Sequence, residues 1–307
     1  MQSKRQITIL YTFTISAVLI AAVCFSDLEL VIADDVPEFG ARINLGLVEY
    51  GGIDEASGIA ASRKTDGVVW AHNDSGDLPR IFAIGADGRH LGTFTLNGIS
   101  ARDWEDIAAG PGPVKGEMYL YIGEIGDNGA RYNLKHIYRF PEPDIDPDGA
   151  PAKKSIGTFD RITYRYPDGN RDAETLMVDP RTSDIYIVSK REDMVRVYRL
   201  PYPQATDKTV IPKHVATLDL TSTNGGDISP DGSEILIKNY TSIFYWKLPE
   251  SGDLWRAFDT KPHVVPYIPE PQGEGVAWKP DGSGYYTLSE EKSGRPAYLY
   301  FYPRTGE

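Results

Sequence analysis

The sequence predicts an all-β protein, a β-propeller of five four-stranded blades. Three observations indicate this fold. A short motif recurs five times, each repeat continues with the same succession of a turn and further β-branched or aromatic segments, and no long segment shows the 3.6-residue apolar period of a helix. Four antiparallel strands repeated at roughly 50 residues are typical of propeller blades.

Each repeat opens with a six-residue motif that begins with an acidic or amide residue and has Ile, Leu or Val in its fifth position. The motifs start 48, 69, 52 and 48 residues apart. They are EASGIA (55–60), DWEDIA (103–108), DAETLM (172–177), NGGDIS (224–229) and QGEGVA (272–277). We expect each motif to form the first strand of a blade.

A turn and three further strands are predicted after each motif. Asp-Gly and Pro-Asp-Gly turns follow the motifs, and they supply the backbone angles that tight hairpins need. The second strands are VVWAHND (68–74), MYLYIGE (118–124), IYIVSKR (185–191), ILIKNY (235–240) and YYTLSEE (285–291). An aromatic-rich third strand follows in every repeat. A fourth is visible in four of them, as HLGTFTL (90–96), ITYRYP (162–167), HVATLDL (214–220) and HVVPYIP (263–269).

The fifth repeat reaches the end of the chain after its third strand. We expect INLGLVEY (43–50) to supply its fourth strand, because closing the ring with the N-terminal segment removes the open sheet edges. The propeller domain is therefore predicted to span 43–307, after a linker over 34–42. The long second repeat contains EPDIDPDGAPAKKS (142–155), interpreted as a Pro/Asp-rich loop before an outer strand. A sixth, degenerate blade at this place is the alternative.

Residues 1–33 have the pattern of an export signal. Lys4 and Arg5 precede an apolar run over 7–25, and small residues precede a cut predicted after Ala33. An uncleaved membrane anchor is the alternative, because about 20 apolar residues can span a bilayer. Either way the domain is predicted to be extracytoplasmic, secreted or periplasmic, with no membrane contact beyond this segment. The single cysteine, Cys24, lies in it, so the mature domain has no disulfide and no cysteine metal site.

The composition and the absence of several known motifs argue against particular classes of function. A net charge of −12 and a pI near 5.0 argue against a nucleic-acid partner, because phosphate binding needs a basic surface. The sequence contains no G-x-S-x-G, H-E-x-x-H, P-loop or G-x-G-x-x-G motif. We expect a monomer.

The predicted strand pairing brings polar side chains to one end of the ring, here called the mouth. Since the first two strands of a blade are antiparallel, the start of the first lies beside the end of the second. Many of these side chains are carboxylates, which divalent cations prefer, and lysines stand among them. The candidate ligand-binding residues are His72, Asn73, Asp74, Glu124, Asp127, Asn128, Lys190, Lys238 and Glu290.

Two positions of the motif are predicted to have different roles, one structural and the other in metal binding. In the first position acid and amide are interchangeable, which favours acceptors of backbone hydrogen bonds between blades; this set is Glu55, Asp103, Asp172, Asn224 and Gln272. In the third position only three blades carry a charge, which favours an off-centre metal site. The candidate metal ligands are Glu105, Glu174 and Glu274, while Ser57 and Gly226 hold the other two third positions.

These motifs resemble a superfamily of exported bacterial propellers that includes the SdiA-regulated proteins and the esterase-like phytases. The resemblance lies in EASGIA with HNDSG, DWEDIA with IGDN, and GEGVAW with LSEE. QGEGVAW is also similar to the Glu-Gly motif of the gluconolactonase/regucalcin family, and SPDGSEI and KPDGSGY resemble TolB-type repeats. The resemblance implies Glu274 as a cation ligand, with Glu105 and Glu174 as its equivalents. The gluconolactonase pattern has six blades, where five are predicted here.

The sequence therefore predicts an exported propeller that binds a small or anionic ligand at its acidic mouth, together with a divalent cation such as Ca²⁺. No catalytic residue is predicted. If the protein is an enzyme, we expect a metal-dependent hydrolase of an ester or phosphoester. The alternative is a non-catalytic propeller that binds a protein or a cell-surface glycan.

Overall fold

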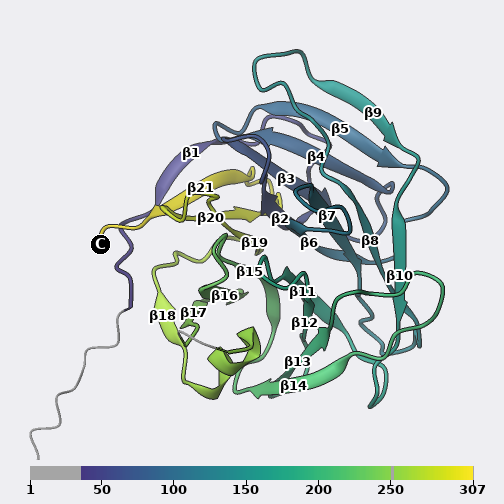
Figure 1. Cartoon of the computed structure of the whole chain (residues 1–307). Coiled ribbons are helices and arrows are strands. Elements are labelled where there is room, and N and C mark those ends of the chain that lie inside the picture. The colour runs from purple at the N-terminus through teal and green to yellow at the C-terminus, as the bar shows by residue number, and fades with distance from the viewer. Residues whose placement is uncertain (1–35, 250–251, 307) are drawn as a thin grey trace, which may run out of the picture. The chain divides into compact units, whose positions relative to one another are not determined.

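Five blades surround a common axis in the computed structural model, which describes residues 36–249 and 252–306 (Figure 1). The innermost strand of each blade contains one of the repeated motifs. These strands are β2 (Ala56–Ala61), β6 (Trp104–Pro111), β11 (Ala173–Val178), β15 (Thr223–Ile228) and β19 (Gly273–Trp278). Each contacts the next, and β19 contacts β2. The five-bladed prediction is confirmed, and the described residues form no sixth blade.

Antiparallel strands continue each blade outward. Blades 1 and 2 add β3 (Val68–Asn73), β4 (Arg80–Gly85) and β5 (His90–Leu96), and β7 (Met118–Glu124), β8 (Lys135–Pro141) and β10 (Asp160–Tyr164). Blades 3 and 4 add β12 (Ile185–Ser189), β13 (Val195–Leu200) and β14 (Lys213–Leu218), and β16 (Glu234–Asn239), β17 (Ile243–Lys247) and β18 (His263–Val265). Blade 5 adds β20 (Gly284–Ser289), β21 (Tyr298–Pro303) and β1 (Ile43–Leu47).

The N-terminal strand closes the ring as predicted. β1 pairs antiparallel with β21, the last strand of the chain. Within the predicted linker, Phe39 forms a bridge with Arg304 and packs against Trp278 and Tyr285. The predicted signal or anchor over 1–33 lies outside the described residues. No helix in the described part is long and apolar enough to cross a membrane.

The segment predicted as a loop over 142–155 ends in a strand that the sequence analysis missed. β9 (Ala152–Ile156) pairs in parallel with β5 and becomes a fifth strand of blade 1. The outer edge of β5 would otherwise expose a row of unpaired backbone groups, which β9 satisfies. The chain then crosses to blade 2, where β10 is the outer strand that was expected.

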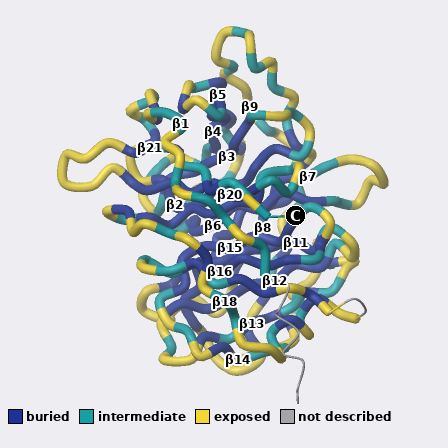
Figure 2. Tube along the Cα trace, turned by 90° about the vertical axis from the view of Figure 1, so that its left-hand side faces the viewer, coloured by how far each residue is buried: buried dark blue, intermediate teal, exposed yellow. Residues whose placement is uncertain are grey.

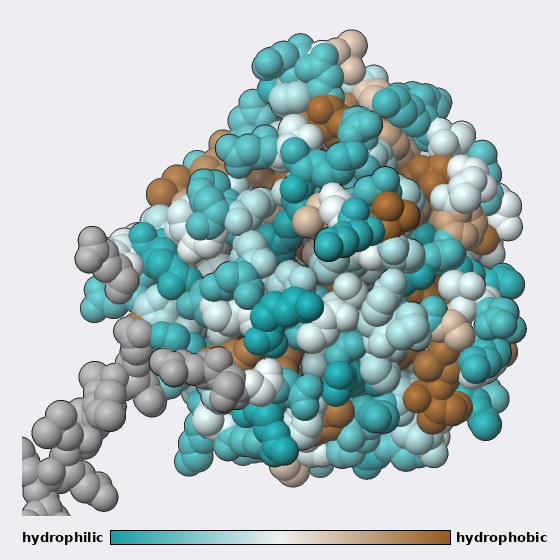
Figure 3. All heavy atoms as spheres, in the orientation of Figure 1, coloured by the Kyte–Doolittle hydropathy of each residue, from teal (hydrophilic) through white to brown (hydrophobic). Residues whose placement is uncertain are grey.

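The core lies between the blades. Trp70, Trp104, Trp246 and Trp278 are at most 1% exposed and belong to this core. Buried residues follow the inner strands in Figure 2, and exposed residues gather in the connecting loops. On the face seen in Figure 3, hydrophilic side chains predominate and hydrophobic ones form separate patches. Apart from a short 3₁₀ helix, η1 (Leu254–Asp259), the described chain is built from strands and loops.

Candidate functional site

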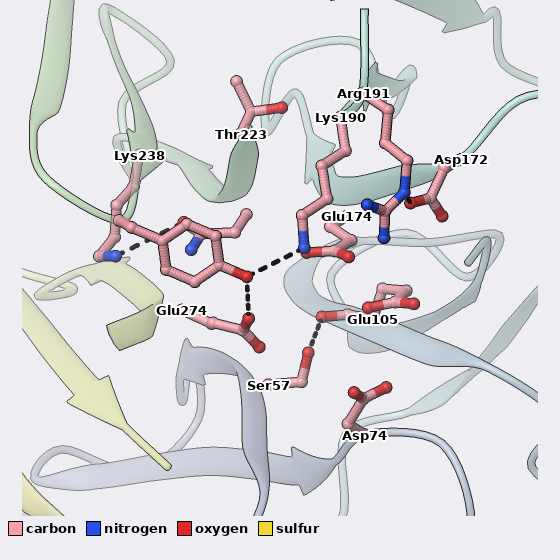
Figure 4. Close-up of polar contacts among 12 residues, drawn as sticks. Ser57, Asp74, Glu105, Asp172, Glu174, Lys190, Arg191, Thr223, Lys238 and Glu274 are labelled. Atoms are coloured by element: carbon pink, nitrogen blue, oxygen red, sulfur yellow. Dashed lines mark hydrogen bonds and ion pairs between the residues drawn. The ribbon is translucent and has the colours of Figure 1, made fainter. Parts of the chain in front are cut away.

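The innermost strand of every blade has a β-bulge at the mouth. In blade 2, Trp104 pairs with Glu124 and Asp106 with Gly123, so Glu105 has no partner in the ladder. An unpaired bulge residue re-aims its side chain relative to the sheet. The five bulge residues, in blade order, are Ser57, Glu105, Glu174, Asn224 and Glu274. They form one polar ring at the mouth, part of which is drawn in Figure 4.

The bulges correct the alignment of blade 4. The sequence placed Gly226 in the third position, but the bulge of β15 falls between Thr223 and Gly225, at Asn224. The turn that follows agrees, because Ser229 donates to Glu234 in the place where Asp179 donates to Asp184 in blade 3. NGGDIS therefore begins two residues too late. In the correct register Gly226 stands at the motif position that is Ile, Leu or Val in the other four blades, so the sequence pattern pointed to Ile228 instead.

Carboxylates tie neighbouring blades together, but mostly from a position other than the predicted one. Oδ2 of Asp106 accepts the backbone N–H of Leu176 in the next blade at 2.8 Å. Oδ2 of Asp227 accepts that of Trp278, also at 2.8 Å. Neither aspartate is a first-position residue. Within the predicted first-position set, Asp172 has such a role, because its Oδ1 accepts the N–H of Asp127 at 2.6 Å.

Carboxylates from blades 1 to 3 converge in two overlapping groups. Oxygen atoms of Asp74, Asp103 and Glu105 lie within 4.8 Å of one another, and so do those of Glu105, Asp172 and Glu174. Glu105 belongs to both groups. Two unit negative charges at such a separation repel each other by about 3–4 kcal/mol at an effective dielectric constant of about 20. An arrangement of this kind needs compensating positive charge or protons.

The second group has its compensating charge built in. Nε of Arg191 donates to Oδ2 of Asp172 at 2.6 Å, and Nζ of Lys190 forms an ion pair with Glu174. In the first group, by contrast, none of the three carboxylates forms an ion pair with any described residue. We refer to Asp74, Asp103 and Glu105 as the open group and to Asp172 and Glu174 as the paired group.

Glu105 is the most unusual member of the ring. It is only 3% exposed, and within 36–249 and 252–306 no donor forms a hydrogen bond with its carboxylate. The backbone of Gly126 lies directly against it. A Cβ atom at Gly126 would stand 2.0 Å from Oε1 of Glu105 and 2.6 Å from Oδ2 of Asp103. Glycine at this position therefore leaves room for both carboxylates.

Burial and mutual repulsion raise the pKa values of these acids. Burial, followed by the charge of Glu174, raises the pKa of Glu105 well above its ordinary value. Burial and the charge of Asp74 raise the pKa of Asp103 to about 6. For Glu174, burial raises the pKa to about 8, although Lys190 opposes the shift. The mouth therefore holds more negative charge than its protein surroundings stabilise.

The other half of the mouth is connected by hydrogen bonds. Lys190 donates to the hydroxyl of Tyr240 at 3.1 Å, and this hydroxyl donates to Oε1 of Glu274 at 2.8 Å. Glu274, a predicted metal ligand, thus lies outside both carboxylate groups. Glu290 stands nearby, and burial together with the charge of Glu274 raises its pKa to about 7.

Lys238 holds blades 4 and 5 together. It is fully buried, and its ammonium group contacts the backbone carbonyls of Asn239, at 3.0 Å, and of Gly273. Burial lowers its pKa to about 7. Its contacts are with the protein's own carbonyl groups, and they anchor the start of β19 beside the mouth.

Of the five remaining predicted ligand-binding residues, four contact other groups of the protein. His72 is fully buried beside Trp104, and Asn73 donates to the carbonyl of Gly52 at 2.9 Å. The hydroxyl of Tyr138 donates to Glu124 at 3.2 Å. Asp127 accepts the N–H groups of its own loop, from Arg131 and Tyr132, and pairs with Lys135 at 3.0 Å. Asn128 is exposed, and with Arg191 and Asp172 it lines a cavity of about 300 Å³ next to the paired group.

Three residues that the structure brings to the site were not among the metal-binding or ligand-binding residues predicted from the sequence. Asp103 was assigned to the structural ring, yet it belongs to the open group. Tyr240 and Arg191 lie at the ends of predicted second strands, but the sequence did not show which residues they contact. Strand pairing was the available signal, since the residue after each second strand lies beside a bulge. In blades 1, 3, 4 and 5 that residue is Asp74, Lys190, Tyr240 or Glu290.

Comparison of the sequence with protein-family models and with curated proteins yields no match. Among solved structures, the chain is similar to one described as a nidogen/laminin complex, at 13% identity and a TM-score of 0.44, over 77% of this chain and 73% of the other. It is also similar to a luciferin-regenerating enzyme, at 10% identity and a TM-score of 0.46, over 86% and 95% of the two chains. Likenesses this distant say nothing about function, and the propeller assignment rests on the sheets themselves.

Proposed function

We propose that this protein is an exported propeller that binds a divalent cation at the open group of Asp74, Asp103 and Glu105. The cation that we expect there is Ca²⁺. The cation would in turn bind a small anionic ligand. Hard divalent cations prefer oxygen ligands, and Ca²⁺ accepts six to eight of them in flexible geometry. Three carboxylates leave positions for water or for a ligand.

The observation that carries this proposal is the unpaired carboxylate of Glu105. Burying an ionised carboxylate without hydrogen bonds or a counter-charge is costly, so proteins pair such groups or place them on a metal. Glu105 is 97% buried and has two further carboxylates beside it, yet no described cation reaches it. A bound cation would supply the missing charge.

The same cation could support chemistry on a ligand. A divalent ion polarises an ester or phosphoryl oxygen and lowers the pKa of a bound water. Arg191 uses Nε for Asp172, while half of its side chain remains exposed toward the neighbouring cavity, where it could contact an anionic ligand. We extend the proposed binding function to the hydrolysis of an ester or phosphoester.

A non-catalytic module for protein or glycan binding would be favoured by a run of exposed aromatic side chains on one face. Among the described residues the exposed tyrosines are Tyr132 and Tyr202. Tyr132 lies in the β7–β8 loop on the mouth side, whereas Tyr202 follows β13 on the opposite side. They do not form such a run, so we favour the cation-dependent binder.

Calcium titration of the full chain tests the proposal. Protein freed of metal with a chelator should bind Ca²⁺ in calorimetry, and Ca²⁺ at 100 times its dissociation constant should stabilise the fold by about 2.7 kcal/mol. Glu105→Gln should weaken binding at least tenfold, because it removes one charge and one strong ligand. Failure of the wild-type protein to bind Ca²⁺, Mg²⁺ or Mn²⁺ would contradict the proposal.

Two variants serve as controls. Glu117→Gln changes an exposed glutamate in the turn on the opposite face and should leave binding unchanged. Gly126→Ala removes no carboxylate but places a methyl group where Oε1 of Glu105 now lies. It should weaken Ca²⁺ binding about as much as Glu105→Gln does. Unchanged binding in Gly126→Ala would show that the open group is not the site.

A further inference from the structure

The ring at the mouth already contains a positive charge that the protein itself supplies, the ammonium group of Lys190. Nζ of Lys190 forms an ion pair with Glu174 and a hydrogen bond with the hydroxyl of Tyr240, 3.1 Å away. The same hydroxyl donates to Glu274 at 2.8 Å. Lys190 is 7% exposed, so its ammonium group lies inside the ring (Figure 4).

The surroundings of Lys190 match those of the open group in donor type. Glu105, Asp172 and Glu174 place carboxylate oxygens within 4.8 Å of one another, as Asp74, Asp103 and Glu105 do. The difference is the counter-charge. Lys190 and Arg191, which are neighbours in the chain, neutralise the carboxylates of Glu174 and Asp172.

We infer that Lys190 is a tethered substitute for a second divalent cation, and that it limits the mouth to one exchangeable ion, at the open group. This inference deepens the proposed function, because it concerns the same ring. An ammonium group has one charge and three donors, so it neutralises Glu174 but leaves no position for an external ligand. It therefore also restricts ligand binding to the side of blades 1 and 2.

Loss of Lys190 should open the second position. Lys190→Met keeps most of the length of the side chain and removes its charge, which leaves Arg191 as the one described ion-pair partner of Glu105, Asp172 and Glu174. We expect Lys190→Met to bind one more Ca²⁺ per chain than the wild type in calorimetry of the full, metal-free chain. Lys190→Arg keeps the charge and should bind the same number of ions as the wild type.

A second pair of experiments ties the extra ion to this position. Adding Glu174→Gln to Lys190→Met should remove the extra ion, because Glu174 is then uncharged. In Lys190→Ala, n-propylammonium chloride should compete with the extra Ca²⁺, since it replaces the missing ammonium group. This variant also serves if Lys190→Met folds poorly, which circular dichroism would show.

The outcomes separate this inference from the proposed function. If the wild type binds one ion and neither Lys190→Met nor Lys190→Ala binds another, the inference is wrong and the open group stands. If the wild type binds none and Lys190→Met binds one, the proposed site at the open group is wrong, while the inferred role of Lys190 as a substitute for a cation is supported. An extra ion that survives Glu174→Gln would lie elsewhere and would also overturn the inference.

Discussion

The two halves of the mouth have the same backbone architecture, but the negative charge is neutralised by the protein in one half and not in the other. Each half is built from bulge residues of adjacent blades and from the residue that follows each second strand. In blades 3 to 5 the charged groups are connected, from Glu174 through Lys190 and Tyr240 to Glu274. In blades 1 and 2 no member of the open group forms an ion pair with a described residue.

This difference shows how a repeated fold produces a single asymmetric site. The backbone supplies five equivalent bulges, and the side chains at and beside these bulges differ from blade to blade. Where a lysine follows the second strand, as in blade 3, the ring is neutralised internally. Where an aspartate follows it, as Asp74 does in blade 1, the excess negative charge remains and can attract a cation.

The largest expected effect separates the carboxylates that hold the blades together from those that line the mouth. Asp106→Ala should lower the free energy of unfolding in metal-free buffer by about 3 kcal/mol. It removes a buried acceptor of the N–H groups of Ile107 and Leu176, at 2.9 and 2.8 Å, and leaves both groups unsatisfied. Denaturant unfolding monitored by tryptophan fluorescence measures this change.

Asp103→Ala is the matched control for Asp106→Ala. Asp103 belongs to the same motif, but no described residue donates a hydrogen bond to its carboxylate. Its removal also relieves repulsion within the open group, so stability in metal-free buffer should stay within about 0.5 kcal/mol of the wild type. A similar loss in both variants would mean that the distinction between structural and open carboxylates is wrong.

The dependence of stability on pH should reveal the uncompensated charge. The pKa values of Asp103, near 6, and Glu174, near 8, are raised in the folded protein. Between pH 5 and 8 the folded state therefore binds more protons than the unfolded state, whose carboxyl groups titrate near pH 4. Stability of the metal-free protein should fall as pH rises through this window, by up to about 1.4 kcal/mol per pH unit for each carboxyl group that is protonated only in the folded state.

Calcium and the Glu105→Gln variant make this test specific. Saturating Ca²⁺ should reverse the slope, because the ion binds the deprotonated carboxylates. Glu105→Gln should flatten the slope in metal-free buffer, because it removes a carboxyl group whose own pKa is raised well above its ordinary value in the folded protein. A metal-free wild type whose melting temperature rises from pH 5 to 7 would contradict the predicted excess of charge.

The blades were predictable from the sequence because each is a local unit with its own motif, turn and aromatic strand. Closure by residues 43–47 was also predictable, since the fifth repeat lacked a strand. β9 was not, because AKKSI has no alternating pattern and joins blade 1 from a distant part of the chain. Its pairing is decided by a free edge that only the assembled blade provides.

The sequence predicted an acidic cluster at the mouth, but it did not predict correctly which residues form it. Glu105 and Glu174 were placed at the mouth by the repeat, and the structure brings them together. Asp103 was separated from them because position in a motif does not reveal which carboxylates have donors. The shift in blade 4 had a different cause, because Gly226 occupies the position where the other motifs have Ile, Leu or Val, and the alignment therefore followed Ile228, two residues later.

The smallest expected effect tests whether the two halves act independently. Tyr240→Phe removes the hydroxyl between Lys190 and Glu274 and keeps the ring, over which Lys190 lies 5.3 Å from the centroid. Two hydrogen bonds to charged groups are lost at a half-buried position, so we expect the free energy of unfolding to fall by about 0.5–1 kcal/mol. Calcium affinity at the open group should change less than about twofold, because Tyr240 touches none of its members and sits across a screened, water-accessible mouth. If calorimetry instead shows a tenfold loss of affinity, the ring is a single electrostatic unit, and the asymmetry among the five bulge residues does not confine the cation to blades 1 and 2.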